Sequence, residues 1–291
     1  RLKTVAASAG ASRSAQAGGT FKDAGPVISF EGVTVQTPTG HRLLEQLAFT
    51  VGQGETLLIT GHNGAGKSSI IRCLCSLWHV PCGIIARPGG AVQAEEDLQL
   101  HSQIYYLPQK PCNVLGSLSD QLTYPIKEPG GLPENELRQW LSYVDLEYLV
   151  DNKIYSCDDP DDESVRNWEE TLSIGEQQAL SIARLLYHRP RFAILDECTS
   201  AVSRALERRL FGVARELGTA CITIAHRPVL EDHHMRALRL TGACAAGGRG
   251  WRIEDLPARR ALPEALPWCP SPEEAHRRIR GCIDRGGPPA H

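Results

Sequence analysis

The stretch Gly61-His62-Asn63-Gly64-Ala65-Gly66-Lys67-Ser68 decides the fold of this chain. An apolar run, Thr56 to Thr60, precedes it, and an apolar-periodic segment, Ser69 to Trp78, follows it. A short apolar run is typical of a buried strand, and the period of the following segment predicts a helix. The sequence therefore predicts a strand, a glycine-rich loop and a helix in succession.

This loop has the chemistry of a phosphate cradle. Glycines let the backbone aim successive N–H groups into one concavity, and the N-terminus of the following helix favours anions. Lys67 can extend to the outer phosphates of a nucleoside triphosphate, and the Ser68 hydroxyl is suited to ligate the Mg²⁺ that bridges them. The alternative, a glycine-rich turn with a surface lysine, does not explain the flanking strand and helix. We expect nucleotide contacts from Gly61, His62, Asn63, Gly64, Ala65, Gly66, Lys67, Ser68 and Ser69.

Composition limits the remaining classes of function. The chain has 291 residues, 42% of them apolar, which is enough for one large or two small domains. A net charge of -3, with lysine and arginine scattered, makes nucleic acid an unexpected partner. No apolar run reaches about 18 residues, so no membrane span or secretory signal is expected. Ten cysteines without a C-x-x-C pair favour reduced thiols, and the start at Arg1 suggests a piece of a longer protein.

The chain before the loop predicts a linker and a small β-sheet. Residues 1–25 are rich in Ala, Ser and Gly without apolar periodicity, and we expect a disordered linker there. Strands are expected at Val27–Phe30, Val33–Gln36 and Leu47–Val51, with a turn at residues 37–40.

The chain after the helix predicts a short strand, a loop and a second buried strand. Pro81 ends the helix, Gly83–Ala86 is a strand candidate, and residues 89–98 form a loop. Ile104–Leu107 is a strand that delivers Gln109 to the edge where the phosphate loop lies, if both strands are parallel. Helical spacing from about residue 117 to residue 150 indicates an inserted helical unit, about 112–188, and the acidic run 158–163 is expected to be a solvated loop.

Two further stretches place chemistry at the same edge. Ser173, followed three residues later by Glu176, is a capping box, which by itself could merely start a helix. The apolar strand Arg191–Leu195 ends in Asp196 and Glu197, and adjacent acids at the end of such a strand need a cation or a water to act on. Asp196 is suited to hold Mg²⁺ and Glu197 to act as general base.

The last stretches complete the predicted sheet. A second strand, Ala220–Ala225, delivers His226, for which we favour γ-phosphate sensing over a role as an ordinary structural histidine. Strands Ala237–Leu240 and Trp251–Ile253 are expected to pair as a hairpin at the sheet's edge. Residues 257–291 are expected to form a poorly ordered tail with one short helix, Pro272–Ile283.

In this order, the phosphate loop, Gln109, the Ser173 segment, the two acids and His226 resemble the ATP-binding cassette of ABC transporters over about residues 26–256. The resemblance implies an α/β fold: a P-loop NTPase (RecA-like) core with a small antiparallel β-subdomain and an inserted α-helical subdomain. It implies ATP and Mg²⁺, with Ser68, Gln109 and Asp196 as metal ligands. It also implies a head-to-tail dimer in which Ser173 and Gly175 of one copy close over the ATP of the other. The expected catalytic residues are Glu197, His226 and Gln109.

Details narrow the resemblance to subfamily D, the peroxisomal fatty-acyl half-transporters. They include Leu107–Pro111, Tyr124-Pro125, Trp168, residues 187–190, residues 196–203 and residues 226–228. The resemblance implies a membrane domain N-terminal to the cassette, a homo- or heterodimer, acyl-CoA or a related lipid acid or vitamin as cargo, and a cassette on the cytosolic face of the peroxisomal or another organelle membrane. Two alternatives stay open: a soluble ABC ATPase without a transport role, and a regulatory cassette that hydrolyses ATP weakly.

Four departures from the family pattern carry expectations of their own. Ile174 replaces a glycine and is expected to crowd the partner's nucleotide, and Ala179 replaces an arginine that links the helix. Ser203 replaces an aspartate, a change that subfamily D shares. No aromatic residue lies near Thr37 to stack on adenine, and Thr37 or His41 is expected to serve weakly.

Overall fold

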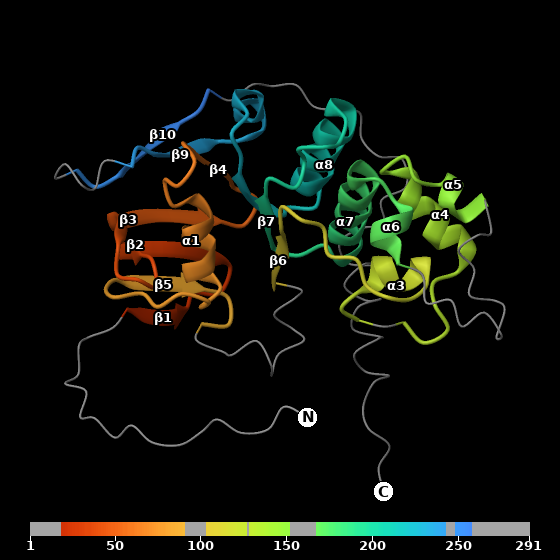
Figure 1. Cartoon of the computed structure of the whole chain (residues 1–291), viewed down its shortest axis with the longest axis horizontal. Coiled ribbons are helices and arrows are strands. Elements are labelled where there is room, and N and C mark those ends of the chain that lie inside the picture. Colours follow the sequence, from red (N-terminus) through yellow and green to blue (C-terminus); the bar gives the residue numbers. More distant parts are fainter. Residues whose placement is uncertain (1–18, 91–102, 127, 152–166, 243–247, 258–291) are drawn as a thin grey trace, which may run out of the picture.

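The computed structural model of this protein describes residues 19–90, 103–126, 128–151, 167–242 and 248–257 (Figure 1). Several expectations lie outside these residues: the linker up to residue 18, most of the loop 89–98, the acidic run 158–163, and the tail with its helix at 272–283. The described elements form two sheets and two groups of helices.

The smaller sheet has four strands in the order β1-β5-β2-β3. β1 pairs with β5 in parallel, and β2 pairs with β5 and β3 in antiparallel register. The linker expected through residue 25 is wrong at its end, because residues 20–23 form β1. The two strands expected between residues 27 and 36 are one strand, β2, whose register with β3 shifts beyond Phe30, next to Gly32 with its φ of +62°. The bounds are β1 (Thr20–Asp23), β2 (Val27–Gln36), β3 (Arg42–Gly52) and β5 (Ile84–Arg87).

The larger sheet has six strands in the order β10-β9-β4-β8-β7-β6. All neighbours are parallel except β10, which forms the predicted antiparallel hairpin with β9. Every residue of β7 and β8 is buried, as expected for central strands of a parallel sheet. Parallel pairing brings the carboxyl ends of β4, β6, β7 and β8 to one edge. The bounds are β4 (Thr56–Gly61), β6 (Ile104–Leu107), β7 (Phe192–Asp196), β8 (Ala220–Ile224), β9 (Arg236–Leu240) and β10 (Trp251–Asp255).

The helix after the glycine loop, α1 (Lys67–Leu74), is shorter than the predicted segment 69–78. The buried guanidinium of Arg87, from β5, donates hydrogen bonds to the carbonyl oxygen of Leu74 and, at 3.1 Å, to the Ser76 hydroxyl. Ser76 has a φ of +59°, so the backbone has already left the helix there. A cation at the last carbonyls is a typical way to end a helix.

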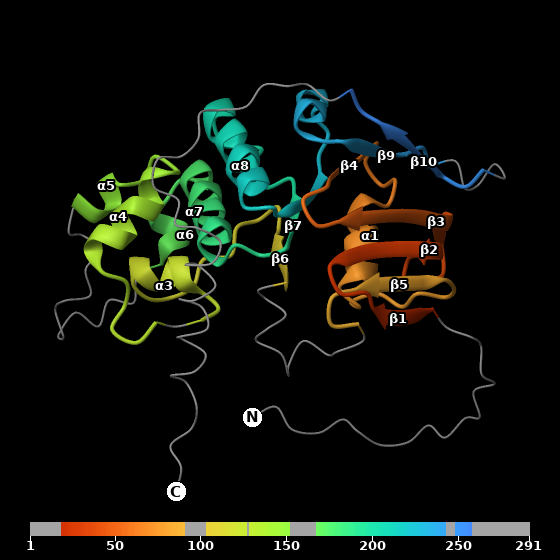
Figure 2. The ribbon, with the colours of Figure 1, turned by 180° about the vertical axis from the view of Figure 1, so that it is seen from behind.

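The remaining helices gather at the opposite end of the molecule from the small sheet, as Figures 1 and 2 both show. Their apolar faces share a core with the face of β6 and β7 that carries Tyr105 and Leu195. Trp168 is fully buried there, and its indole N–H donates to the carbonyl oxygen of Gly116 at 2.8 Å. These helices are α3 (Leu118–Thr123), α4 (Glu134–Ser142), α5 (Tyr148–Asp151), α6 (Trp168–Thr171) and α7 (Ile174–His188), with α8 (Arg204–Glu216) and the 3₁₀ helix η1 (Pro228–His233) nearer the large sheet.

Helix length also bears on membrane insertion. None of the helices within the described ranges is both long enough and apolar enough to span a bilayer.

Candidate nucleotide site

The loop from Gly61 to Lys67 joins β4 to α1 in the predicted order. Gly64 and Gly66 have φ angles of +81° and +99°, the left-handed region that side chains rarely adopt. A Cβ placed on Gly66 would also lie 3.4 Å from the Leu43 side chain, which the sequence did not connect with this loop. The glycines therefore serve the tight turn that precedes the first helical residue.

The side chain of Lys67 is folded along this loop. Its ammonium donates to the carbonyl oxygens of Gly61 and His62, each at 3.0 Å, and the residue is buried. Burial lowers the pKa of Lys67, while the nearby carboxylates of Glu197 and Asp196 oppose that shift. One cation thus lies between the loop and two acids.

Ser68 and Asp196 meet across the sheet's edge. The Ser68 hydroxyl is hydrogen-bonded to the Asp196 carboxylate, which also accepts from the Tyr106 hydroxyl at 3.1 Å. Burial raises the pKa of Asp196, the two hydrogen bonds lower it, and Glu197 adds to the rise. Burial and the Asp196 charge likewise raise the pKa of the Tyr106 phenol. The sequence reasoning missed Tyr106, which looks like an ordinary aromatic residue of a buried strand.

Glu197 lies between the other two predicted catalytic residues. Its Oε2 accepts from the amide Nε2 of Gln109 at 2.9 Å, and its Oε1 lies 3.0 Å from Nε2 of His226. The side chains of Glu197 and His226 remain 25% and 39% exposed, so a ligand can reach them from solvent. The structure therefore brings together three residues that the sequence placed at three separate strand ends.

The backbone of Glu197 is in an unusual conformation. Its φ is +50°, a region that residues with a Cβ seldom adopt, and its N–H donates to the Ile224 carbonyl of β8 at 3.0 Å. Such conformations are frequent at functional sites, where the surrounding structure over-determines them. Here the turn directs the carboxylate out of the sheet toward Gln109 and His226.

The donors also allow a test of whether Mg²⁺ fits this edge. Ser68 and Asp196 supply a hydroxyl and a carboxylate that already contact each other, which is oxygen chemistry suited to Mg²⁺. Within the described ranges, no three His, Cys, Asp or Glu side chains gather as a metal group of their own. The donor set thus fits an ion that also takes oxygens from phosphate and water.

The remaining residues predicted to contact nucleotide or adenine lie in the glycine loop and in the turn near Thr37. Nδ1 of His62 lies 2.8 Å from the carbonyl oxygen of Asn63, while Ala65 and Ser69 are buried. The turn at residues 37–41 is closed by bonds from Thr37 N–H to the His41 carbonyl at 2.8 Å and from His41 N–H to the Thr37 hydroxyl at 3.1 Å.

Ser173 and Gly175 lie elsewhere, at the start of α7. Ser173 is the N-cap residue and Glu176 completes the capping box, as predicted. Among the described residues, none of the hydrogen bonds recorded for Ser173 reaches the glycine loop of the same chain. The side chain between them, Ile174, is 66% exposed. The two predicted halves of the nucleotide site are therefore separate features of one molecule.

A second set of contacts that sequence reasoning missed ties α7 to the segment after β7. A Cβ on Gly175 would come within 2.9 Å of the Ala201 carbonyl oxygen, so this position requires a glycine. Buried Gln178 donates to the Ser200 hydroxyl at 3.1 Å and accepts from the Ala201 N–H at 2.9 Å. Only the adjacent glutamines of the helix could have hinted at this.

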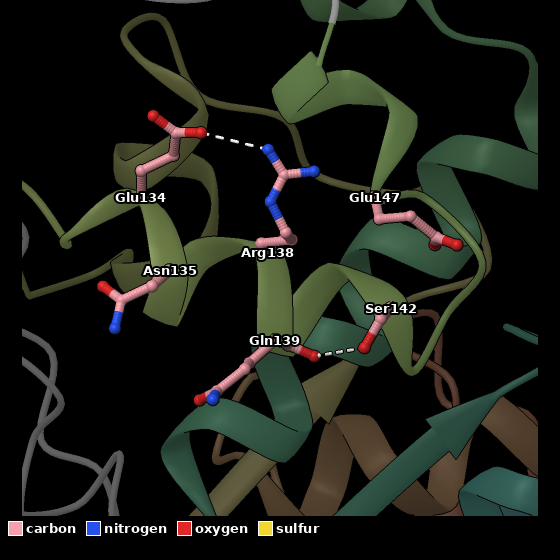
Figure 3. A pocket seen from close by; sticks show the side chains of 6 residues that line it. All are labelled: Glu134, Asn135, Arg138, Gln139, Ser142 and Glu147. Atoms are coloured by element: carbon pink, nitrogen blue, oxygen red, sulfur yellow. Dashed lines mark hydrogen bonds and ion pairs between the residues drawn. The ribbon is translucent and has the colours of Figure 1, made fainter.

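A shallow pocket on the outer face of α4 contains none of these residues (Figure 3). Arg138 crosses it to Glu134 at 3.0 Å, and the Ser142 hydroxyl donates to the Gln139 carbonyl at 2.8 Å. The residues that line it are polar or charged, and none of them is a histidine or a cysteine: Glu134, Asn135, Arg138, Gln139, Ser142 and Glu147.

A buried strand, a glycine loop, a lysine-led helix and an acid pair at a parallel edge together define a nucleoside-triphosphatase of the phosphate-loop class. Residues 44–200 match the protein family described as ABC transporter. The chain therefore belongs to the ABC transporter family, as its nucleotide-binding, ATP-hydrolysing cassette.

Curated relatives narrow the similarity to subfamily D. The chain is 46% identical over 229 residues to ABC transporter D family member 1 of Arabidopsis thaliana, covering 78% of this chain and 16% of that protein. It is 39% identical over 219 residues to ATP-binding cassette sub-family D member 1 of Drosophila melanogaster, and the match covers 74% of this chain and 28% of that protein. It is 36% identical over 220 residues to ATP-binding cassette sub-family D member 3 of Homo sapiens, and the match covers 74% of this chain and 31% of that protein. The chain thus spans between a sixth and a third of these relatives.

Proposed function

We propose that this chain is the ATP-driven engine of a subfamily D half-transporter. The observation that carries the proposal is the position of Glu197, between Gln109 and His226 and beside the Lys67, Ser68 and Asp196 cluster. The proposed fold assignment is a P-loop NTPase core with an antiparallel β-subdomain and a helical subdomain.

In this proposal each residue at the edge has a defined task, and Gln109 has two. The loop amides and Lys67 bind the phosphates of ATP, and Ser68, Asp196 and Gln109 would hold Mg²⁺. When bound, Mg²⁺ neutralises charge on the phosphate oxygens. Glu197 accepts a proton from the attacking water as general base, Gln109 orients the Glu197 carboxylate, and His226 donates a hydrogen bond to the γ-phosphate.

The second half of the site comes from another copy. Ser173 sits at the N-terminus of a 15-residue helix, where orphan N–H groups and the helix dipole favour an anion. Because α7 lies apart from α1, the helix that follows the glycine loop (Figures 1 and 2), we propose that two cassettes, identical or different, meet head to tail. Closure on ATP and release after hydrolysis would then drive the attached machinery.

Membrane, cargo and location follow from the resemblance to subfamily D. We propose a transmembrane domain N-terminal to the cassette, which would face the cytosol at the peroxisomal or another organelle membrane. The proposed cargo is a fatty acyl-CoA or a related lipid acid or vitamin.

Replacing Glu197 with glutamine tests the general base. The amide cannot accept the proton, so we expect steady-state hydrolysis to fall by about 100-fold or more. Since the amide is nearly isosteric and nucleotide binding is retained, ATP should trap a dimer visible by analytical ultracentrifugation. Glu231→Gln, which alters a surface ion pair with Arg239, is the matched control and should leave the rate unchanged. Unchanged hydrolysis in Glu197→Gln would remove the base assignment.

A further inference from the structure

The hydroxyl of Ser173 is not free at the helix start; a carboxylate holds it. Ser173 Oγ donates to Oε2 of Glu176 at 2.5 Å, and the Ser173 N–H donates to the same oxygen at 2.8 Å. In return the Glu176 N–H donates to Ser173 Oγ at 3.3 Å. The orientation of the serine hydroxyl therefore depends on where the Glu176 carboxylate lies.

A residue from another helix holds that carboxylate from the other side. The Tyr148 hydroxyl, on α5, donates to Oε1 of Glu176. Burial opposes ionisation of Glu176, but the hydrogen bonds from Ser173 and Tyr148 outweigh it and lower the pKa of this carboxyl. Glu176 is thus an anion whose two oxygens are both occupied by donors.

This matters because an anion stands beside a helix start that faces an incoming polyphosphate. A carboxylate oxygen free to turn outward would repel the phosphates and draw the serine hydroxyl away from them. Three donors on Glu176 spread its charge and keep both oxygens within the cap. Tyr148 supplies the donor that comes from outside the capping box, and its bond joins two elements about 28 residues apart.

We propose that Tyr148 is a positioning residue for Ser173: through Glu176 it fixes the place of the Ser173 oxygen, whose hydroxyl hydrogen turns from Glu176 to the γ-phosphate when a second copy brings ATP. The inference rests on the head-to-tail dimer proposed above. In this role Tyr148 contacts neither the nucleotide nor the attacking water. The residue is 39% exposed, so removal of the hydroxyl leaves the core packing in place.

The test is a double-mutant cycle on ATP-dependent dimerisation, measured by analytical ultracentrifugation in the Glu197→Gln background. Tyr148→Phe is expected to raise the dimer dissociation constant about fivefold, the effect of one hydrogen bond. In a Ser173→Ala background the same change should alter the constant by less than about twofold, because the hydroxyl that Tyr148 positions is gone. ATP binding to the monomer and the unfolding midpoint should stay unchanged in Tyr148→Phe.

Tyr187→Phe is the matched control. Tyr187 lies near the other end of α7, and its hydroxyl also contacts a glutamate, Glu128, at 3.4 Å. Its loss should leave the dimer constant unchanged. If Tyr148→Phe has no effect, or the same effect with and without Ser173, the positioning role is overturned. If Ser173→Ala itself leaves dimerisation unchanged, Ser173 does not contact the partner's nucleotide and the positioning role falls with it. If the Glu197→Gln protein forms no ATP-dependent dimer at all, the proposed dimer fails instead, so the two failures are distinct.

Discussion

Two regions of this molecule, the strand edge and the start of α7, are proposed to bind the same anion, yet they differ in how they are assembled. The strand edge gathers Lys67, Ser68, Asp196, Glu197 and His226, which lie at or beyond the ends of three strands and are linked by hydrogen bonds or charge within one chain. The start of α7 offers a capped serine beside an exposed isoleucine. In the proposal above, the first region supplies a base, a cation and a phosphate sensor, and the second supplies hydrogen-bond donors alone.

The difference shows how catalysis can be made conditional. A strand edge is rigid, so it can hold reactive groups in place permanently. In the proposed dimer, the helix start is instead brought to the site by a second molecule. The contacts of Gln178 with Ser200 and Ala201 join α7 to the segment after β7 inside one chain.

The largest expected effect is at the strand edge, from Lys67→Met. The variant keeps most of the side-chain length but removes a charge that can make about two charge-assisted hydrogen bonds to phosphate, worth about 2 kcal/mol each. Affinity for ATP should fall about a thousandfold, measured by titration of the monomer at low protein concentration. Lys22→Met, on exposed β1, is the control. If Lys67→Met binds ATP normally, the strand edge is not the phosphate site, and it cannot be compared with the start of α7 as a second part of that site.

The residues of the strand edge that could be predicted share one property. Each lies in a short continuous stretch whose residue pattern alone indicates its structure. The glycine loop is contiguous, and Asp196 and Glu197 end an apolar strand whose burial the sequence already implies. Parallel pairing of β7 with β8 then brings Glu197 to His226. Periodicity and turn residues were sufficient for these.

The parts that could not be predicted depend on contacts between residues distant in the sequence. Tyr106 and Asp196 are 90 residues apart, and Tyr148 and Glu176 are 28 apart, so no local pattern connects them. β1 is four residues long and pairs with β5 some sixty residues later, which made it look like a linker. The early end of α1 likewise depends on Arg87, which reaches it from another strand.

Lowering the pH is expected to lower the free energy of unfolding through buried His234, which is hydrogen-bonded to β8 of the large sheet. Its Nδ1–H donates to the Leu230 carbonyl at 2.7 Å, and its Nε2 accepts from the Thr223 hydroxyl of β8 at 2.8 Å, an arrangement that needs the neutral ring. Burial lowers the pKa of His234 from 6.5 to about 4; the Leu230 bond opposes this and His233 adds to it.

The unfolded chain therefore binds the proton more readily than the folded protein. The stability that neutral His234 contributes is complete above pH 7. It is lost as the pH falls from about 6.5 to 4, which lowers the free energy of unfolding by up to about 3 kcal/mol. Chemical denaturation between pH 4 and pH 7 should show the slope, and His234→Asn should remove that part of it, while exposed His79→Asn should not. An identical slope in wild type and His234→Asn would contradict the assignment.

The smallest expected effect concerns the link between the two regions. Gln178→Met keeps the length of the side chain but loses the bonds to Ser200 and Ala201, and exposed Gln139→Met on α4 is its control. Because Ser200 and Ala201 are exposed, water can replace the lost partners, and the free energy of unfolding should fall by only about 1 kcal/mol. If the link sets how α7 sits against the edge, ATP affinity of the monomer stays normal while ATP-dependent dimerisation weakens. If Gln178→Met weakens ATP binding to the monomer as much as it weakens dimerisation, Gln178 is part of the strand edge itself. The two regions would then be a single site.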